Sequence, residues 1–166
     1  MVRSKHVTLT LFVVVVGILA GVYCFQTEGK KIKKQFKLLS KRASKDHDEN
    51  NFTMAGKARS IGTLFAKNCT IDAHIASLSG SHTRQEISGL AARARLPFSR
   101  LSVRFYDLHI EFSEEKTARV TVTAQASGTL KRGDVLDDTL EIECSLRKSD
   151  DKWLFTAIEV VEVLEK

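Results

Sequence analysis

The sequence predicts an α+β domain in which a curved antiparallel sheet wraps around N-terminal helices, preceded by one N-terminal transmembrane helix. From Arg100 to Lys166 the chain has four long alternating stretches joined by short polar turns, which is the pattern of antiparallel strands. Before them, two stretches repeat an apolar side chain every third or fourth position, which is the pattern of amphipathic helices. The chain opens with an apolar run long enough to cross a bilayer.

That run extends from Val7 to Phe25 without a charged residue. As a helix it would be about 28 Å long at about 1.5 Å per residue, close to the thickness of the hydrocarbon core. The end of the run, residues 21–26, lacks the small-x-small pattern of a cleaved signal peptide, which favours an uncleaved span. The chain is therefore divided into a basic tail (1–6), a transmembrane helix (7–25), a linker (26–29) and a folded domain (30–166).

The formal charge of +6 is concentrated just after this run. A basic block beside a membrane indicates attraction to anionic lipid, so we expect no nucleic-acid partner. The expected membrane-surface residues are Lys30, Lys31, Lys33, Lys34 and Lys37.

The membrane orientation has two opposing signals. More basic residues come after the run than before it, which favours a cytoplasmic domain. The short basic tail is typical of an anchor that keeps its tail inside and exports the domain. We expect a single-pass protein with its domain on the extracytoplasmic (periplasmic) side.

Three helices are expected. The stretch 30–45 carries the stripe Ile32, Phe36, Leu39 and Ala43, which either packs on the sheet or lies on the membrane surface. The stretch 53–66 repeats the pattern with Met54, Ala58, Ile61 and Phe65. Thr83 and Glu86 form a capping box that begins a third helix, and Pro97 ends it.

Strands make up the remainder. Residues 69–75 alternate and predict a strand, and 77–81 predict a turn or a very short strand. The long strands are expected at 101–112, 117–126, 136–146 and 153–163. In the first of these the apolar positions change phase between Phe105 and Leu108, so we expect a β-bulge near Tyr106 and Asp107 that restores one apolar face. The small apolar side chains of 120–126 leave room for something to lie against them.

The order helix, helix, strand, short strand, helix and four long strands resembles the nuclear-transport-factor-two-like superfamily, which includes ketosteroid isomerases and SnoaL-like proteins. The segments that carry the resemblance are 78–87, 103–110 and 152–160. The resemblance implies a cone-shaped, cystatin-like roll around a pocket, and a homodimer through the outer sheet face. The expected pocket lining is Phe36, Phe65, Phe105, Val122, Ala124 and Trp153.

An isomerase of that superfamily needs a carboxylate base opposite a tyrosine and a protonated aspartate in an apolar pocket. The catalytic candidates here are Asp72, His74 and Tyr106. Asp72 with His74, and Asp107 with His109, are spaced as acid/base pairs on one strand face, or as surface pairs. The stretch 30–45 contains no tyrosine, so the set is incomplete.

Metal and cofactor sites have no support, because no Cys-x-x-Cys or Cys/His ligand spacing occurs. Cys69 and Cys144 fall on expected strands and are either disulfide-bonded or small buried side chains. Four arginines either line an anion site or are scattered on the surface: Arg93, Arg95, Arg100 and Arg104.

Three functions remain open. The first is a membrane-anchored, non-enzymatic ligand-binding or assembly module that uses the cone pocket or the sheet face. In layout this resembles the assembly domain of bacterial type IV secretion inner-membrane proteins. The second is a small-molecule isomerase or dehydratase with Asp72 as general base. The third is an anionic-lipid-surface protein that uses the basic stretch from Lys30 to Arg42.

Overall fold

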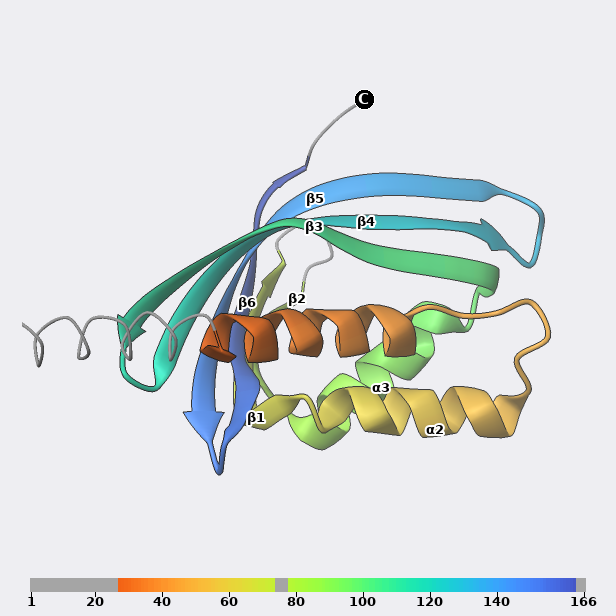
Figure 1. The fold of residues 1–166 in the computed structure, drawn as a ribbon. Helices are drawn as coiled ribbons and strands as arrows, with labels where there is room; N and C mark the ends of the chain where they lie inside the picture. The colour runs from red at the N-terminus through yellow and green to blue at the C-terminus, as the bar shows by residue number, and fades with distance from the viewer. Residues whose placement is uncertain (1–26, 74–77, 164–166) are drawn as a thin grey trace, which may run out of the picture.

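The computed structural model describes residues 27–73 and 78–163 (Figure 1). Residues 27–43 form the first helix described. The subsequent elements are α2 (Asn51–Gly62), β1 (Phe65–Ala73), β2 (Leu78–Thr83), α3 (Arg84–Arg95), β3 (Phe98–Glu114), β4 (Thr117–Leu130), β5 (Val135–Ser149) and β6 (Lys152–Val163). The predicted α+β class is confirmed.

The six strands form one sheet in the order β2-β1-β6-β5-β4-β3. Every neighbouring pair is antiparallel except β1 and β6, which are parallel. The expectation of a purely antiparallel sheet was therefore wrong. Short turns fix only the pairing of strands that are consecutive in the chain, and β1 reaches β6 without a hairpin.

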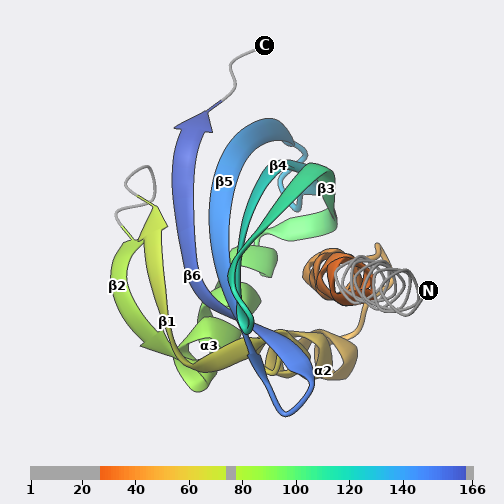
Figure 2. The ribbon, with the colours of Figure 1, turned by 60° about the vertical axis from the view of Figure 1, so that its left-hand side comes forward.

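The sheet is curved, and the 27–43 helix lies under it. β3, β4 and β5 arch over this helix, with α2 and α3 on its other side (Figure 1). Figure 2 shows that the strands curl from β2 at one edge of the sheet to β3 at the other, and that the 27–43 helix lies beside β3.

The predicted helical stripes face the core. Ile32 and Phe36 are buried, and Leu39 and Ala43 pack against the same cluster, so the 27–43 helix packs on the sheet. Ala58 and Ile61 of α2 are likewise buried. Phe65 is buried but belongs to β1, because α2 ends at Gly62 and Phe65 pairs with Phe155 of β6.

Several boundaries differ from those expected. Residues 27–29, assigned to a linker, are helical, because Glu28 makes contacts that fix this turn against the β5–β6 hairpin. Of the turn or very short strand expected at 77–81, the structure has the strand: β2, Leu78–Thr83, pairs with β1. The capping box of Thr83 and Glu86 is confirmed, and α3 ends at Arg95, before Pro97.

The predicted bulge is confirmed. The register of β3 against β4 shifts between Tyr106 and His109, and Asp107 has a positive φ of 53°. Phe105, Leu108, Ile110 and Phe112 consequently all pack against the core. One irregular residue thus keeps a 17-residue strand apolar on a single face.

In residues 27–73 and 78–163, no helix has the length and apolarity needed to span a membrane. The expected tail 1–6 and transmembrane helix 7–25 lie outside the described residues, as does His74.

Candidate functional site

Aromatic side chains fill the concave side of the sheet. Phe36 is 2% exposed, and its ring centroid lies 5.4 Å from that of Phe105 and 5.1 Å from that of Phe155, both edge-on. The ring centroids of Phe65 and Phe155 lie 5.3 Å apart and those of Phe112 and Trp153 lie 5.9 Å apart, with the rings tilted in both pairs. Such pairs add attraction beyond their buried area. The structure therefore places these aromatic residues in packed contact where a cone pocket would lie.

The expected lining residues take part in this packing. Phe36, Phe65, Val122 and Trp153 are buried members of the core cluster, and Phe105 and Ala124 pack against it. The small side chains of β4 leave space that faces the 27–43 helix. Ile32 and Phe36 of this helix belong to the same buried cluster as Val120 and Val122 of β4.

Asp72 lies on the outer face of β1. Its neighbour Ile71 packs against the core, and successive side chains of a strand point to opposite faces. The Ser79 hydroxyl of β2 donates a hydrogen bond of 2.7 Å to Asp72 Oδ1. The carboxylate therefore faces away from the interior.

Tyr106 is also on the outer side, because Phe105 packs inward. It is 40% exposed, and its hydroxyl lies 3.5 Å from Gln125 Oε1. Between its strand β3 and the strand β1 of Asp72 lie β4, β5 and β6, a separation of about 19 Å at about 4.8 Å per strand. These two catalytic candidates are not brought together.

The second acid/base spacing does not form a pair either. Asp107 is the bulge residue, so the alternation that would align it with His109 is broken. The ring of His109 contacts Glu111 instead, at 3.2 Å, and both side chains are exposed.

An open groove runs between the 27–43 helix and β3, next to the bulge. We call it the β3 groove; its volume is about 440 Å³. It is lined by Lys33, Phe36, Lys37 and Ser40 of the helix and by Arg104, Phe105, Tyr106 and Leu108 of β3. The floor is apolar, because Phe36, Phe105 and Leu108 are the side chains that pack on the core.

Hydrogen bonds fix the helix against β3 at one end of the groove. Lys45 exchanges two backbone bonds with Leu101, of 2.7 and 3.0 Å. The Ser40 hydroxyl donates to the Val103 carbonyl at 2.6 Å, and the Ser44 hydroxyl accepts from the Val103 N–H at 3.0 Å. The groove opens beyond these bonds, toward Lys33 and Leu108.

The walls of the β3 groove are cationic. Lys33, Lys37 and Arg104 line it, all three are exposed, and none of the residues that line it is acidic. A side-chain hydrogen bond with Tyr106 raises the pKa of Arg104. The arrangement can therefore offer positive charge above an apolar floor.

A second hollow of about 500 Å³ lies on the outer face of β3, β4 and β5 and shares Arg104 with the groove. Arg100 also lines it, together with Ser102, Ser127 and Asp137. Of the four arginines singled out in the sequence, Arg100 and Arg104 thus come together, Arg93 is exposed on α3, and Arg95 is buried.

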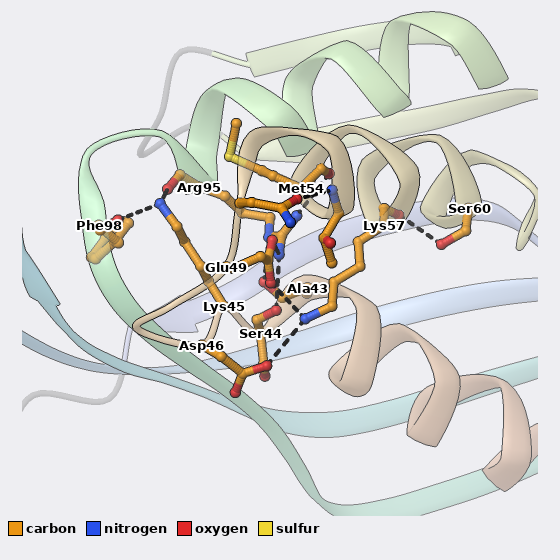
Figure 3. Close-up of polar contacts among 12 residues, drawn as sticks. Ala43, Ser44, Lys45, Asp46, Glu49, Met54, Lys57, Ser60, Arg95 and Phe98 are labelled. Carbon is orange, nitrogen blue, oxygen red and sulfur yellow. Dashed lines mark hydrogen bonds and ion pairs between the residues drawn. The ribbon is translucent and has the colours of Figure 1, made fainter.

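Arg95 belongs to a buried ion-pair cluster that sequence reasoning missed (Figure 3). The Arg95 and Glu49 side chains are 2% and 1% exposed, and Arg95 Nη2 lies 2.5 Å from Glu49 Oε1. Arg95 also donates to the carbonyls of Ala43, Ser44 and Met54 at 3.0 to 3.2 Å. It joins the C-terminal end of the 27–43 helix to α2 and α3, which is a structural role.

Two lysines complete this cluster. Lys57 bonds to Glu49 Oε2 at 2.5 Å, and Lys45 donates to the carbonyls of Phe98 and Arg95. Burial lowers the pKa of Lys45, and nearby Lys131 adds to this. No sequence signal pairs Glu49 with Arg95, which are 46 residues apart.

The thiols of Cys69 and Cys144 are buried and free. Burial raises the pKa of Cys69 to about 11 and also raises the pKa of Cys144. Within the described part of the chain, no three His, Cys, Asp or Glu side chains are placed to hold a metal ion.

The expected membrane-surface lysines differ in their surroundings. Lys30, Lys33, Lys34 and Lys37 are exposed. Lys31 instead forms an ion pair of 2.9 Å with Glu28.

Comparison with known proteins identifies the fold. No protein-family model matches the chain, and no curated protein matches it. Among solved structures, an NTF2-like protein with a cystatin-like fold from Novosphingobium aromaticivorans has 13% identity and a TM-score of 0.67, covering 86% of this chain and 86% of its own. The fold is nuclear-transport-factor-two-like.

Two further structures agree with this fold. A protein from the same organism described as a scytalone dehydratase has 14% identity and a TM-score of 0.62, over 87% of both chains. The Kfla4162 protein from Kribbella flavida has 12% identity and a TM-score of 0.68, over 82% of this chain and 90% of its own. At these identities the likeness extends to the nuclear-transport-factor-two-like, cystatin-like fold alone.

Proposed function

We propose that this domain is a non-enzymatic binding module that takes its ligand in the β3 groove, and that residues 7–25 anchor it in a membrane as a single span with the domain on the extracytoplasmic side. The observation that carries the binding proposal is the aromatic packing of the concave side. Because these side chains occupy the place of a cone pocket, the packing supports a module whose ligand binds in the open β3 groove instead. The volume of this groove, about 440 Å³, is within the ordinary range of ligand sites.

The placement of the catalytic candidates supports binding over catalysis. An acid/base pair must reach one substrate within hydrogen-bond distance. Asp72 and Tyr106 lie on β1 and β3, with three strands between them, and the β3 groove has no acidic lining residue. The isomerase or dehydratase alternative would need Asp72 to leave Ser79 and turn inward.

Photolabelling of the full chain in phosphatidylcholine nanodiscs tests the proposal. The probe is an alkyl diazirine, and labelled peptides are mapped by mass spectrometry. We expect labels on Phe36 and on residues 104–108, and at least fivefold fewer in Leu108→Glu, which places a charge on the apolar floor. The matched control is Ala92→Glu, in the hollow between α2 and α3, which should leave labelling of the β3 groove unchanged.

Labels on Ile71 and Phe155, in preference to the β3 groove, would contradict this proposal. That result would mean that the concave side opens in solution, and it would favour the enzyme alternative. The anchor is tested separately: the full chain should stay with membranes after alkaline carbonate washing, and its release would contradict the span.

The exposure of Lys30, Lys33, Lys34 and Lys37 favours a second candidate function, contact with an anionic lipid surface. Amine labelling of the full chain in vesicles tests it. These lysines should be protected in vesicles that contain phosphatidylserine and lose protection at high salt, while exposed Lys67 of β1 reacts equally in both. Equal reactivity of all five lysines in anionic and zwitterionic vesicles would contradict it.

A further inference from the structure

We infer that the ligand of the β3 groove is a single-chain amphiphile with an anionic headgroup. This inference rests on the proposed function and names the chemical class of the ligand. Three observations carry it: the cations that line the groove, the apolar floor, and the interruption of β3 at Asp107.

The headgroup class is set by the charge of the walls. Lys33 and Lys37 are four residues apart on the helix, so they lie on one face with their Cβ atoms about 6 Å apart. Arg104 of β3 lies at the rim that the groove shares with the hollow on the outer face of the sheet, and no carboxylate is among the residues that line the groove. An anion in the groove would be attracted by these charges, whereas a cation would be repelled.

The tail class is set by the floor. Phe36, Phe105 and Leu108 present carbon surface that continues into the core. The Ser40 hydroxyl on the helix wall is already bonded to Val103 O at 2.6 Å. Burial of hydrocarbon on this floor is therefore favourable, whereas a sugar or a nucleotide base would lose hydrogen bonds to water there.

The bulge distinguishes an alkyl chain from an acidic peptide. A peptide that binds beside a strand adds to the sheet through regular backbone bonds. Here the register of β3 breaks between Tyr106 and His109, and Asp107 has φ 53°, and such bulges oppose addition of a strand. An alkyl chain needs no register, so it suits this groove better.

The test compares three diazirine probes with the same alkyl chain on the full chain in phosphatidylcholine nanodiscs: dodecanoic acid, its methyl ester, and a trimethylammonium amphiphile. Labelling of the groove peptides is normalised to labelling of the lipid. We expect the acid to label most, the ester less and the cation least. Lys33→Gln with Lys37→Gln should lower labelling by the acid about fivefold, from about 1 kcal/mol of exposed charge attraction, and should leave the ester unchanged.

The control is Lys34→Gln with Lys41→Gln. It changes the same helix and the same net charge at two exposed residues that do not line the β3 groove, so labelling by the acid should stay at the wild-type level. An equal loss of labelling by the acid in both double variants would mean that the effect comes from general surface charge, and this would overturn the inference. Equal labelling by all three probes would overturn the anionic headgroup and leave the groove as a binding site, whereas no labelling of the groove by any probe would overturn the proposed function as well.

Discussion

Glu28 joins the start of the described chain to its C-terminal hairpin. It accepts hydrogen bonds from Lys31 at 2.9 Å, Lys148 at 3.1 Å and the indole of Trp153 at 2.7 Å. Burial alone would raise the pKa of this carboxyl, but the three donors outweigh it and hold the pKa at about 2, below the ordinary 4.5. The ionised form is thus favoured in the folded protein.

This lowered pKa predicts acid sensitivity. The stabilisation of the folded state by ionised Glu28 is complete above pH 4.5 and is lost as the pH falls from about 4.5 to about 2. The reason is that protonation of Glu28 costs more free energy in the folded than in the unfolded state. The full shift corresponds to about 3 kcal/mol, and water around a side chain that is 21% exposed reduces this to roughly 1–2 kcal/mol. Glu28→Gln should lose that amount at pH 7, measured by urea unfolding.

The fluorescence of Trp153, the single tryptophan, reports this unfolding. Stability of Glu28→Gln should change less than that of the wild type between pH 5 and pH 2. Glu115→Gln, at an exposed turn position, serves as the control and should behave like the wild type. Equal acid sensitivity of Glu28→Gln and the wild type would show that Glu28 does not carry this effect.

Single-residue contacts of this kind were the least predictable from the sequence. Glu28 fell in an expected linker, and its partner Trp153 is 125 residues away. Local periodicity carries no information about such a pair. The capping box of Thr83 and Glu86 was predictable because both partners lie within one turn.

At the scale of elements, the bulge in β3 decides which side chains reach the core. The change of phase after Phe105 was visible in the sequence because strand side chains alternate strictly. The end of α2 was not visible, because the apolar stripe runs on to Phe65 although the helix ends at Gly62.

Asp107→Val tests the bulge. A β-branched residue disfavours the positive φ of 53° that the bulge requires, and without the bulge either Phe105 or the set Leu108, Ile110 and Phe112 would turn to the outer face. We expect a loss of roughly 1–3 kcal/mol in the free energy of unfolding, measured by urea unfolding. Asp107→Gly is the control: it keeps the bulge, suits the positive φ, and should stay within about 1 kcal/mol of the wild type. An Asp107→Val variant as stable as Asp107→Gly would mean that the positive φ at this position is not needed.

Two glycines of α2 have opposite surroundings. A Cβ on Gly56 would meet nothing within 4 Å, whereas a Cβ on Gly62 would press against Ser88 Oγ and lie 2.5 Å from the carbonyl of Arg84. The close approach of α2 and α3 therefore depends on Gly62.

These surroundings predict opposite effects of the same substitution. Gly56→Ala should stabilise the protein by about 0.5–1 kcal/mol, because alanine favours the helix. Gly62→Ala should destabilise it by roughly 1–3 kcal/mol, because the two helices must move apart. Thermal unfolding measures both variants, and the same sign for both would contradict the close contact at Gly62.

At the scale of the whole molecule, the Arg95 cluster holds the three helices together. Its partners lie on the 27–43 helix, on the loop after that helix and on α2. Removal of Arg95 would leave Glu49 with Lys57 as a partner and three carbonyls without their donor, and loss of one member of a buried ion pair typically costs about 3–5 kcal/mol.

Arg95→Met should therefore destabilise the full chain by about 3–5 kcal/mol in urea unfolding. Adding Glu49→Leu to Arg95→Met should recover part of this loss, since the buried carboxylate that has lost Arg95 is then removed as well. Arg93→Met, two residues away on the exposed side of α3, is the control and should change stability by less than about 0.5 kcal/mol. Additive losses in the double variant would contradict coupling between Arg95 and Glu49.

The fold as a whole was more predictable than its site. Long alternating strands, two helical stripes and a capping box are local patterns, and they predicted the order of elements. The β3 groove depends on how the 27–43 helix is seated against β3 through Ser40, Ser44 and Lys45. Lys33, Lys37 and Arg104 were each visible as charges, but only this packing brings them to one groove.

The attachment of the 27–43 helix at both ends has a mechanical consequence. Glu28 fixes one end to the β5–β6 hairpin, and Lys45 with Arg95 fixes the other to β3, α2 and α3. A force applied at residue 27 would therefore reach the β5–β6 hairpin through the contacts of Glu28 with Lys148 and Trp153. These contacts would carry the load before the attachment at the other end of the helix.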